Sequence, residues 1–333
     1  MFGDLSRTGL DSFVFLAPMA GISDLPFRDL ALRFGAGRVV SEMVASSDML
    51  QARPGTRAKA ELGFGRARTA VQLAGREPAA MAEAARFCEG QGAGIIDLNF
   101  GCPAKKVTSG LSGSALMREP DLALRIIAAV AGAVRVPVTV KMRLGWDDGT
   151  RNAPELAARA EAAGVAMIAV HGRTRCQFYQ GRADWSAIAA VKRAVRIPVI
   201  ANGDIGDAAS ARQALARSGA DGVMIGRAAR GAPWLVGRIA AELGGTEAPA
   251  PPEGADLAAL VIEHYQAMLD FYGRDLGLRV ARKHLGWYLE GRPGGAALRA
   301  RLMGLTDPDA VTRALATALA DCGPAQAGIG AAA

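Results

Sequence analysis

One cysteine lies in a turn, where a thiol has chemical rather than packing value. The stretch LNFGCPAKK, residues 98–106, follows a short apolar run and places Cys102 between a glycine and a proline, with Lys105 and Lys106 just behind. A core cysteine would lie inside the apolar run rather than beyond its end. The position of Cys102 therefore predicts a functional thiol at the mouth of a buried strand.

Seven apolar runs end in a group of unusual residues, most of which are polar or glycine. They are Pro18, Met19 and Ala20; Gln72; Asn99; Lys141 and Arg143; His171 and Arg173; Asn202, Gly203 and Asp204; and Gly226 and Arg227. Taken singly, each can be read as a capped or solvated loop residue. If the runs are strands of one parallel barrel, their carboxyl ends meet at one mouth, and the set forms a ring around a single site.

The last two run ends have the composition of a phosphate site. The stretches ANGDI and IGRAA put glycines where strands are expected to turn into helices. Gly203 and Gly226 would let backbone N–H groups approach an anion, and Arg227 could add a charged fork. Glycine at these positions could equally ease a tight turn, but the pattern favours a phosphorylated ligand.

Lys141 and Gln72 need polar partners inside the predicted sheet. Lys141 lies in TVKMRL, where the alternation of a strand points it inward. A buried lysine either has an anionic partner or loses its charge. Gln72 is an amide at the end of another apolar strand, and an aromatic heterocycle with carbonyl and ring-nitrogen groups would satisfy both side chains.

Eight apolar, β-rich runs alternate with alanine-rich helical segments through the first two thirds of the chain. The runs are FVFLAP, RVVSEMV, TAVQLAG, GIIDLNF, PVTVKMRL, AMIAVHG, PVIANGD and GVMIGRA. Strands that are apolar throughout and separated by single helices indicate a parallel sheet covered by helices. Eight such units predict a (β/α)8 TIM barrel over residues 1–243, and no GxGxxG turn follows the first run as a Rossmann fold would require.

The last third of the chain is predicted to be helical. Residues 244–256 are rich in Pro, Gly and Ala, which is typical of a linker. Residues 257–322 have helical spacing and no strand-like run, so we expect a small C-terminal helical domain there. The tail at 323–333 is expected to be disordered.

Composition narrows the class of protein. The N-terminus lacks the pattern of a signal peptide, and no apolar run approaches the roughly 20 residues of a membrane span, so we expect a cytoplasmic protein without a membrane role. The four cysteines and three histidines show neither CxxC pairing nor a metal-ligand spacing, and we expect no metal. A formal charge of +7 suits a polyanionic partner.

The chain resembles the tRNA-dihydrouridine synthases, and most of all their bacterial B-type subgroup. The resemblance runs from about Phe13 to Gly304 and is carried by LAPMAGISDLPFR, DLNFGCPAKKV, VKMRLGW, HGRTR, FYQGRADW, PVIANGDI, DGVMIGRAARGAPW and RKHLGWYL. It implies a barrel that binds FMN and a helical domain that binds tRNA. It also implies reduction of a D-loop uridine to dihydrouridine, with NADPH as the electron source.

The same resemblance implies roles for the residues at the strand ends. Those expected at the flavin are Pro18, Met19, Ala20 and Gln72 along the ring, Lys141 at its pyrimidine side, His171 beside the ribityl and phosphate arm, and Asn202, Gly203, Asp204, Gly226 and Arg227 at the phosphate. Cys102 would be the proton donor, opposite a reduced flavin that supplies hydride through N5. An ordinary thiol, with a pKa of about 8.5, is mostly protonated at neutral pH.

A target base must leave the stack of folded tRNA to enter a barrel mouth, so phosphate contacts must hold the surrounding RNA. The candidate contacts are Asn99 at the uracil edge, Lys105 and Lys106 pointing outward, Arg173 and Arg175, and Arg279, Arg282 and Lys283. The last three have i, i+3 and i+4 spacing and share a helical face, which is also typical of a solvated helix. No obligatory protein partner is expected, and a monomer is consistent with the sequence.

Two other functions are compatible with parts of this pattern. One is an FMN-dependent reductase of a small molecule, similar to dihydroorotate dehydrogenase, and the other is a non-catalytic RNA-binding protein on a relic barrel. The C-terminal helical segment and its basic stripe count against the first. Intact Cys102, Lys141 and phosphate loops count against the second.

Overall fold

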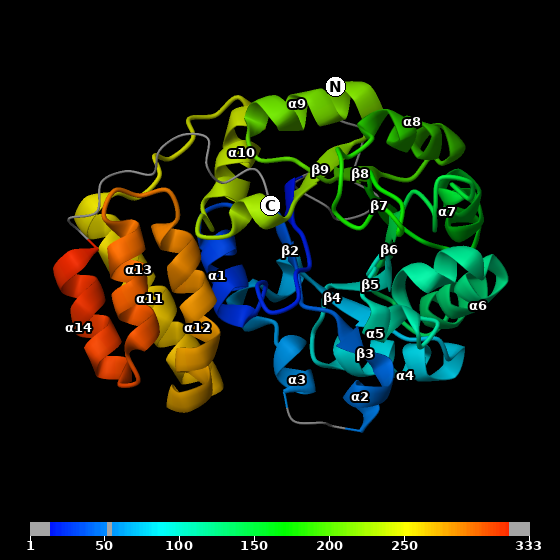
Figure 1. Ribbon diagram of the computed structural model, residues 1–333. Helices are drawn as coiled ribbons and strands as arrows, with labels where there is room; N and C mark the ends of the chain where they lie inside the picture. Colours follow the sequence, from blue (N-terminus) through cyan, green and yellow to red (C-terminus); the bar gives the residue numbers. More distant parts are fainter. Residues whose placement is uncertain (1–13, 52–54, 320–333) are drawn as a thin grey trace.

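The computed structural model describes residues 14–51 and 55–319, and its strands close into one parallel barrel (Figure 1). The strands are β1 (Val14–Leu16), β2 (Arg38–Val40), β3 (Val44–Ala45), β4 (Thr69–Ala74), β5 (Ile95–Phe100), β6 (Val138–Arg143), β7 (Met167–His171), β8 (Val199–Asn202) and β9 (Gly222–Ile225). Strand β1 pairs with both β2 and β9, β2 pairs with β4, and β4 to β9 follow in order. The short β3 adds to β4 outside this ring. The predicted eight-stranded TIM barrel is confirmed.

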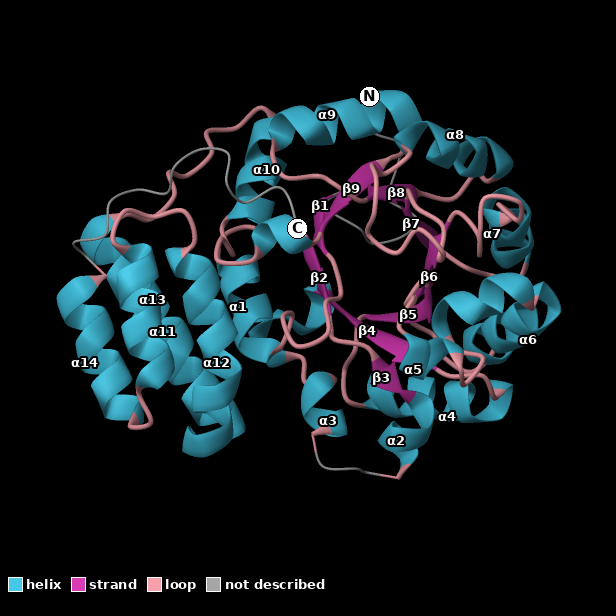
Figure 2. Ribbon diagram, in the orientation of Figure 1, coloured by secondary structure: helices cyan, strands magenta, loops and turns pink. Residues whose placement is uncertain are grey.

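Helices surround the ring of strands on the outside (Figure 2). They are α1 (Leu25–Arg33), α2 (Ser46–Leu50), α3 (Thr56–Lys59), α4 (Pro78–Gly90), α5 (Lys105–Thr108), α6 (Pro120–Ala131), α7 (Ala153–Ala162), α8 (Trp185–Ala194), α9 (Ala208–Ser218) and α10 (Leu235–Gly244), with the 3-10 turns η1 (Gly63–Arg68), η2 (Gly113–Arg118) and η3 (Arg227–Ala229). Helix starts follow the local sequence: in α9, Asp207 and Ser210 form a capping box. The helix ends at Gly219, whose φ of +63° suits glycine.

Two apolar layers pack against the strands, one inside the ring and one outside it. Inside the ring, a small cluster that includes Phe15, Ile95, Met167 and Met224 is buried. A larger layer between the strands and the helices explains why the strands are apolar on both faces. The interior is therefore a packed core, and the loops at the carboxyl ends of the strands are left to form a site.

Four further helices, α11 (Gly254–Tyr272), α12 (Arg274–Leu289), α13 (Gly295–Gly304) and α14 (Pro308–Ala318), confirm the predicted helical segment. They share a second apolar cluster that also takes in Leu30 and Trp234 from the barrel, and Figure 1 shows them beside α1. No helix or strand lies between Gly244 and Gly254, within the expected linker. The tail expected at 323–333 lies outside the described residues. No helix in the described part of the chain has the length and hydropathy to span a bilayer.

Specific contacts fix these helices against the mouth of the barrel. The hydroxyl of Tyr272, at the end of α11, donates a hydrogen bond of 3.0 Å to Asp24, the N-cap residue of α1. Gly231, after β9, has a φ of +65°, and a Cβ there would lie 2.4 Å from the carbonyl oxygen of Trp287 in α12. The loop after β9 therefore packs directly on the backbone of α12.

Candidate active site at the barrel mouth

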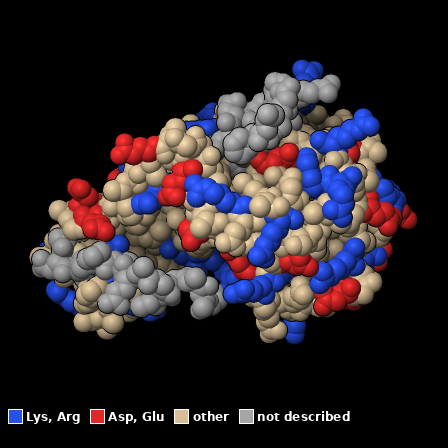
Figure 3. All heavy atoms as spheres, turned by 90° about the horizontal axis from the view of Figure 1, so that it is seen from above, with Lys and Arg blue, Asp and Glu red and all other residues tan. Residues whose placement is uncertain are grey.

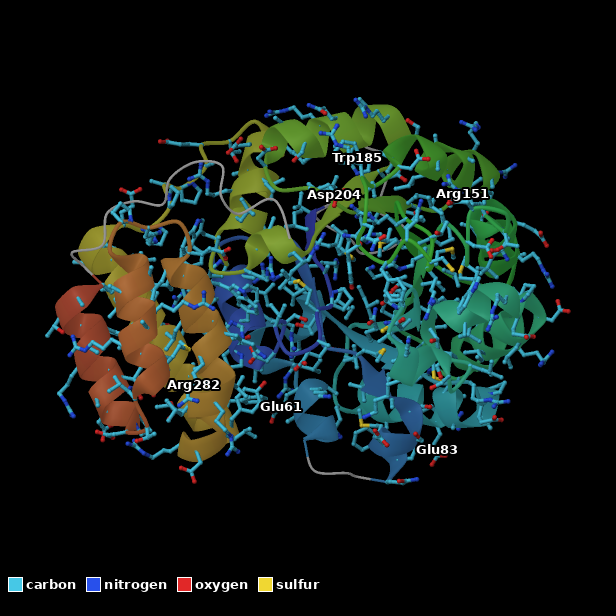
Figure 4. All side chains as sticks on the ribbon, in the orientation of Figure 1. Glu61, Glu83, Arg151, Trp185, Asp204 and Arg282 are labelled. Atoms are coloured by element: carbon cyan, nitrogen blue, oxygen red, sulfur yellow. The ribbon has the colours of Figure 1, made fainter. Side chains whose placement is uncertain are left out.

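A cavity of about 340 Å³ opens at the carboxyl ends of β1, β6, β7, β8 and β9. The expected cofactor contacts that line it are Pro18, Met19, Lys141, His171, Asn202, Gly203, Asp204, Gly226 and Arg227. Figure 4 labels Asp204 at this mouth, with Trp185 beside it. Ala20 and Gln72 are not among the described residues that line the cavity. The topology thus brings together most of the residues that the sequence placed at a cofactor.

The loops after β8 and β9 form an open cradle at one end of the cavity. Gly203 has a φ of +114°, and a Cβ there would lie 2.8 Å from the Ala183 side chain. A Cβ at Gly226 would meet only Ala17, at 3.9 Å, so the backbone at Gly226 faces free space. The cradle also includes the N-terminus of α9, and Arg227 and Arg230 line it. The N-terminus of α9 is already capped by the Asp207 side chain. The backbone N–H groups of the two loops and the two guanidinium groups are the features of the cradle that suit a phosphate.

Asp204 and Arg173, expected at the phosphate and at RNA, form an ion pair with each other. The Asp204 carboxylate accepts hydrogen bonds from Arg173 Nη2 at 2.6 Å and from the Ala183 N–H at 2.7 Å. It also lies 3.8 Å from an Nη2 atom of Arg227. A carboxylate repels a phosphate, so Asp204 is placed to orient these arginines. Arg173 is only 1% exposed and cannot present its guanidinium to RNA.

His171 is held neutral at the edge of the cavity. Asn202 donates its amide N–H to the Met224 carbonyl, so its Oδ1 atom, 2.9 Å from His171 Nδ1, accepts. His171 therefore carries its proton on Nδ1, and Nε2, 3.3 Å from Arg173 Nη1, accepts. Burial, with Lys141 and Arg143 adding repulsion, holds the pKa of His171 well below its usual value.

Lys141 lines this cavity, and its surroundings stabilise the charged ammonium group only weakly. Burial lowers the pKa of Lys141 to about 8, and repulsion from Arg143 adds to the effect. Asp97 and Cys102 act in the opposite direction but do not restore the ordinary value. An anionic or electron-rich ligand beside Lys141 would recover the lost stabilisation of the ammonium group.

The turn that carries Cys102 is fixed by hydrogen bonds from three sides. The Asn99 side-chain oxygen accepts from the N–H groups of Gly101, at 3.1 Å, and Cys102, at 2.9 Å. The Cys102 carbonyl accepts from the Ser114 N–H at 3.1 Å and from its hydroxyl at 2.9 Å. Arg143 Nε donates to the Gly101 carbonyl at 2.9 Å. The half-buried Cys102 therefore lies in a turn held by several hydrogen bonds.

A buried polar chain lies behind this turn. Asn99 donates to Gln72 at 2.7 Å, Gln72 donates to Asp97 at 2.7 Å, and Thr139 donates to Asp97 at 2.5 Å. The sequence placed Gln72 at the flavin and Asn99 at the uracil, whereas here their amides hold one another and the Cys102 turn. Asp97 was missed, although its spacing of two from Asn99 along one strand puts both on the same face. Burial raises the pKa of Asp97.

The Cys102 turn adjoins the cavity through neighbouring strands. Asn99 of β5 is the register partner of Lys141 of β6. A Cβ added at Gly101, the residue before Cys102, would lie 3.4 Å from the carbonyl oxygen of Lys141. Cys102 is not itself among the described residues that line the cavity. It stands at the β5 side, next to the cavity's lysine.

The other expected RNA contacts differ in exposure. Lys105 and Lys106 are exposed on α5, and Arg279 and Lys283 are exposed on α12. Arg282, labelled in Figure 4, is half-buried and donates to the Leu305 carbonyl at 3.2 Å. Seen from above, Lys and Arg side chains spread over much of the barrel surface, with Asp and Glu among them (Figure 3).

The Lys283 ammonium group reaches the loop after β1. A Cβ added at Gly21 would lie 2.8 Å from Lys283 Nζ. Helix α12 therefore presents this cation at the edge of the barrel mouth, beside Pro18 and Met19 of the cavity wall.

Comparison with known proteins identifies relatives over nearly the whole chain. A family model described as dihydrouridine synthase matches residues 15–322. A probable tRNA-dihydrouridine synthase of Rhodobacter capsulatus is 63% identical over 95% of this chain and 98% of its own length. One of Rickettsia conorii is 54% identical, over 92% and 93% of the two chains. The tRNA-dihydrouridine synthase B of Xanthomonas axonopodis is 48% identical, over 89% and 90%.

Solved structures share the fold at low sequence identity. Histamine dehydrogenase from Rhizobium sp. 4-9 aligns with a TM-score of 0.53 and 13% identity, over 78% of this chain and 50% of that one. An amine oxidase from Pseudomonas geniculata aligns with a TM-score of 0.52 and 14% identity, over 74% and 51%. These similarities support the barrel architecture alone.

Proposed function

This chain belongs to the dihydrouridine synthase family, and from that premise we propose that it reduces a uridine in the D-loop of tRNA to 5,6-dihydrouridine, with FMN as cofactor and NADPH as reductant. Its curated relatives, named as tRNA-dihydrouridine synthases, support a tRNA substrate. The similarity to the tRNA-dihydrouridine synthase B of Xanthomonas axonopodis supports the B-type resemblance, and the D-loop in this proposal rests on that resemblance. Because the proposed substrate is tRNA, we expect the enzyme to act in the cytoplasm.

The cavity fits a flavin mononucleotide by its chemistry. The glycine cradle after β8 and β9, with Arg227 and Arg230, would hold the phosphate. Pro18 and Met19 would lie along the ring, and Lys141, whose pKa is lowered to about 8, would gain an electron-rich partner. His171, kept neutral, would lie along the connecting arm. When bound there, the flavin supplies the hydride for one carbon of the uracil double bond.

Cys102 supplies the other hydrogen in this proposal. Saturating the C5–C6 bond of uracil takes a hydride at one carbon and a proton at the other. The Cys102 thiol would give its proton to that second carbon, and the thiolate left behind would be reprotonated from solvent, which its half-buried position allows. Asn99, Ser114 and Arg143 would hold the sulfur in place, since they fix the turn.

The substrate's size supports a role for the helices beyond the barrel. A base that enters the mouth has been extruded from folded tRNA, and the rest of the molecule must rest on the surface around it. The exposed Arg279 and Lys283 of α12, with Lys105 and Lys106 of α5, would contact RNA phosphates. In this proposal α11 to α14 form the tRNA-binding domain.

The observation that carries the proposal is the juxtaposition of a cradle for phosphate, a weakly supported lysine and a fixed thiol at one mouth. The test uses the purified protein, its bound flavin, and tRNA transcripts that lack modifications. Flavin reduced anaerobically by NADPH should be reoxidised on adding tRNA, and mass spectrometry should find a gain of two hydrogens in the D-loop. Reoxidation by a small pyrimidine but not by tRNA would favour a small-molecule reductase. Binding of tRNA without reoxidation would favour a non-catalytic protein.

A further inference from the structure

A stack of aromatic rings and guanidinium groups lies on the rim of the barrel mouth. The Arg118 guanidinium is centred 3.9 Å from the Trp146 ring, and that of Arg175 lies 4.6 Å from the same ring. Arg175 also lies 4.7 Å from the ring of Phe178. These four residues, here the Trp146 stack, come from the segments after β5, β6 and β7. Stacking of this kind holds a guanidinium flat and leaves its N–H edge free.

The Trp146 stack is built on the segments that hold the Cys102 turn. Arg118 ends the 3-10 turn η2, which also contains Ser114, the residue bonded to the Cys102 carbonyl. Arg143 bridges the Gly101 carbonyl and the Phe178 carbonyl, the latter at 2.8 Å. Whatever binds the Trp146 stack therefore lies next to the proposed proton donor.

The two arginines of the stack have unused hydrogen-bonding capacity. Among the described residues, neither Arg118 nor Arg175 has an ion-pair partner or a side-chain hydrogen bond. Arg118 is exposed, while the buried Arg175 Nε has no partner at all.

Nearby acidic residues face other partners. Asp148 accepts from Arg151 Nη2 at 2.6 Å, and Asp147 accepts from the Thr150 hydroxyl at 2.8 Å. Figure 4 labels Arg151 on this side of the barrel. Asp148 also accepts from Gln177 Nε2 at 3.4 Å. The two carboxylates that follow Trp146 in the chain are therefore engaged with other residues, and the guanidinium groups of the stack remain available to an external anion.

We propose that the Trp146 stack is an RNA-binding surface that grips the strand beside the nucleotide held at the mouth. The guanidinium edges of Arg118 and Arg175 would take backbone phosphates, and Phe178 offers a ring on which a neighbouring base can stack. This inference rests on the proposed function, since it assigns part of the RNA contact to the barrel itself, on the side away from α12.

Single substitutions give a direct test in the flavin-loaded enzyme. Binding of an unmodified tRNA transcript is measured by fluorescence anisotropy between low and physiological salt. Arg118→Gln and Arg175→Gln should each weaken binding and reduce the slope of log K against log salt by about 1. Arg118→Lys, which keeps the charge but not the planar fork, should retain the slope and lose part of the affinity.

A matched control exists elsewhere on the barrel. Arg217 lies 5.8 Å from the ring of Trp185 and is also exposed, but it belongs to α9. Arg217→Gln should leave affinity and slope unchanged. Melting temperature and flavin content, measured for every variant, separate lost contacts from lost folding.

The outcomes also separate this inference from the proposed function. If Arg118→Gln and Arg175→Gln bind tRNA like the parent protein at all salt concentrations, the Trp146 stack is not an RNA surface, even where the enzyme makes dihydrouridine. If both variants lose affinity while the parent protein binds tRNA and never reduces it, the RNA surface stands and the proposed activity fails.

Discussion

Replacing Asn99 by alanine tests whether the polar support of the Cys102 turn matters for catalysis. The Asn99 side chain accepts from the N–H groups of Gly101 and Cys102 and donates to Gln72. The substitution removes all three hydrogen bonds. It leaves the buried Gly101 N–H and the buried Gln72 oxygen without these partners, and nothing in alanine can replace them.

The expected cost follows from these contacts. Each buried group left unpaired costs about 1–3 kcal/mol, so Asn99→Ala should lower the free energy of unfolding by about 2–6 kcal/mol. The Cys102 turn would then hold its thiol less firmly, and a misplacement of about 1 Å can cost roughly 10²-fold in rate. Ser114→Ala removes one hydroxyl bond to the Cys102 carbonyl, which keeps the Ser114 N–H, so its cost should be about 1 kcal/mol.

The assay is single-turnover formation of dihydrouridine by NADPH-reduced enzyme at saturating tRNA. We expect a loss of roughly 10²-fold for Asn99→Ala and a smaller loss for Ser114→Ala, with flavin content and the rate of reduction by NADPH kept. Ser218→Ala is the control, because that buried hydroxyl, at the end of α9, also donates to a backbone carbonyl, that of Ala214 at 2.6 Å. It accepts from the Ala220 N–H at 3.1 Å as well, so its removal costs at least as many hydrogen bonds as Ser114→Ala.

Alkylation of Cys102 by iodoacetamide, followed by mass spectrometry, reports on the turn independently of the substrate. Its rate should change in Asn99→Ala. If the alkylation rate and the single-turnover rate both matched those of the parent protein, the support role of Asn99 would be refuted. If the alkylation rate were unchanged but the single-turnover rate depended less on tRNA, Asn99 would instead be assigned a contact with the uracil.

Three other predictions concern charge and docking. Because the pKa of Lys141 is lowered to about 8 from 10.5, the unfolded chain binds more protons between these values. The stability of the flavin-free protein relative to Lys141→Met should therefore rise with pH over that window in denaturant titrations; a flat difference would contradict the shift. Tyr272→Phe removes a donor to Asp24, so it should lower the free energy of unfolding at pH 7 by about 1–3 kcal/mol, and no change in thermal melts would count against that contact. Arg279→Gln with Lys283→Gln should weaken tRNA binding and flatten its salt dependence without changing flavin content, and unaltered binding would remove α12 from the RNA surface.

The sequence was sufficient to predict the barrel because its signals are local and repeated. Apolar runs alternate with helical segments, and runs such as PVTVKMRL and GVMIGRA each follow a helix with clear start and stop residues. The site followed from the fold, since the carboxyl ends of parallel strands share one mouth. Lys141, His171 and Gly203 meet there although they are far apart in the chain.

Pairwise contacts of side chains could not be predicted in the same way. In the stretch HGRTR, Arg173 looks like a surface cation. In the structure its guanidinium group is buried and donates a hydrogen bond to Asp204, thirty-one residues later in the chain. The sequence assigned Gln72 and Asn99 to ligands. Their mutual hydrogen bond depends on the register of β4 and β5, which the sequence does not show. A single sequence shows which residues are polar. The strand register decides whether two polar side chains bond each other or remain available to a ligand.

The most direct test of the central claim is the Cys102→Ala enzyme mixed with unmodified tRNA after anaerobic reduction by NADPH. The variant should keep its FMN and accept electrons from NADPH. It should form dihydrouridine more slowly by a factor of about 10² to 10⁴, the range for loss of a general acid. Formation of dihydrouridine at the parental rate would contradict the assignment of Cys102 as the proton donor.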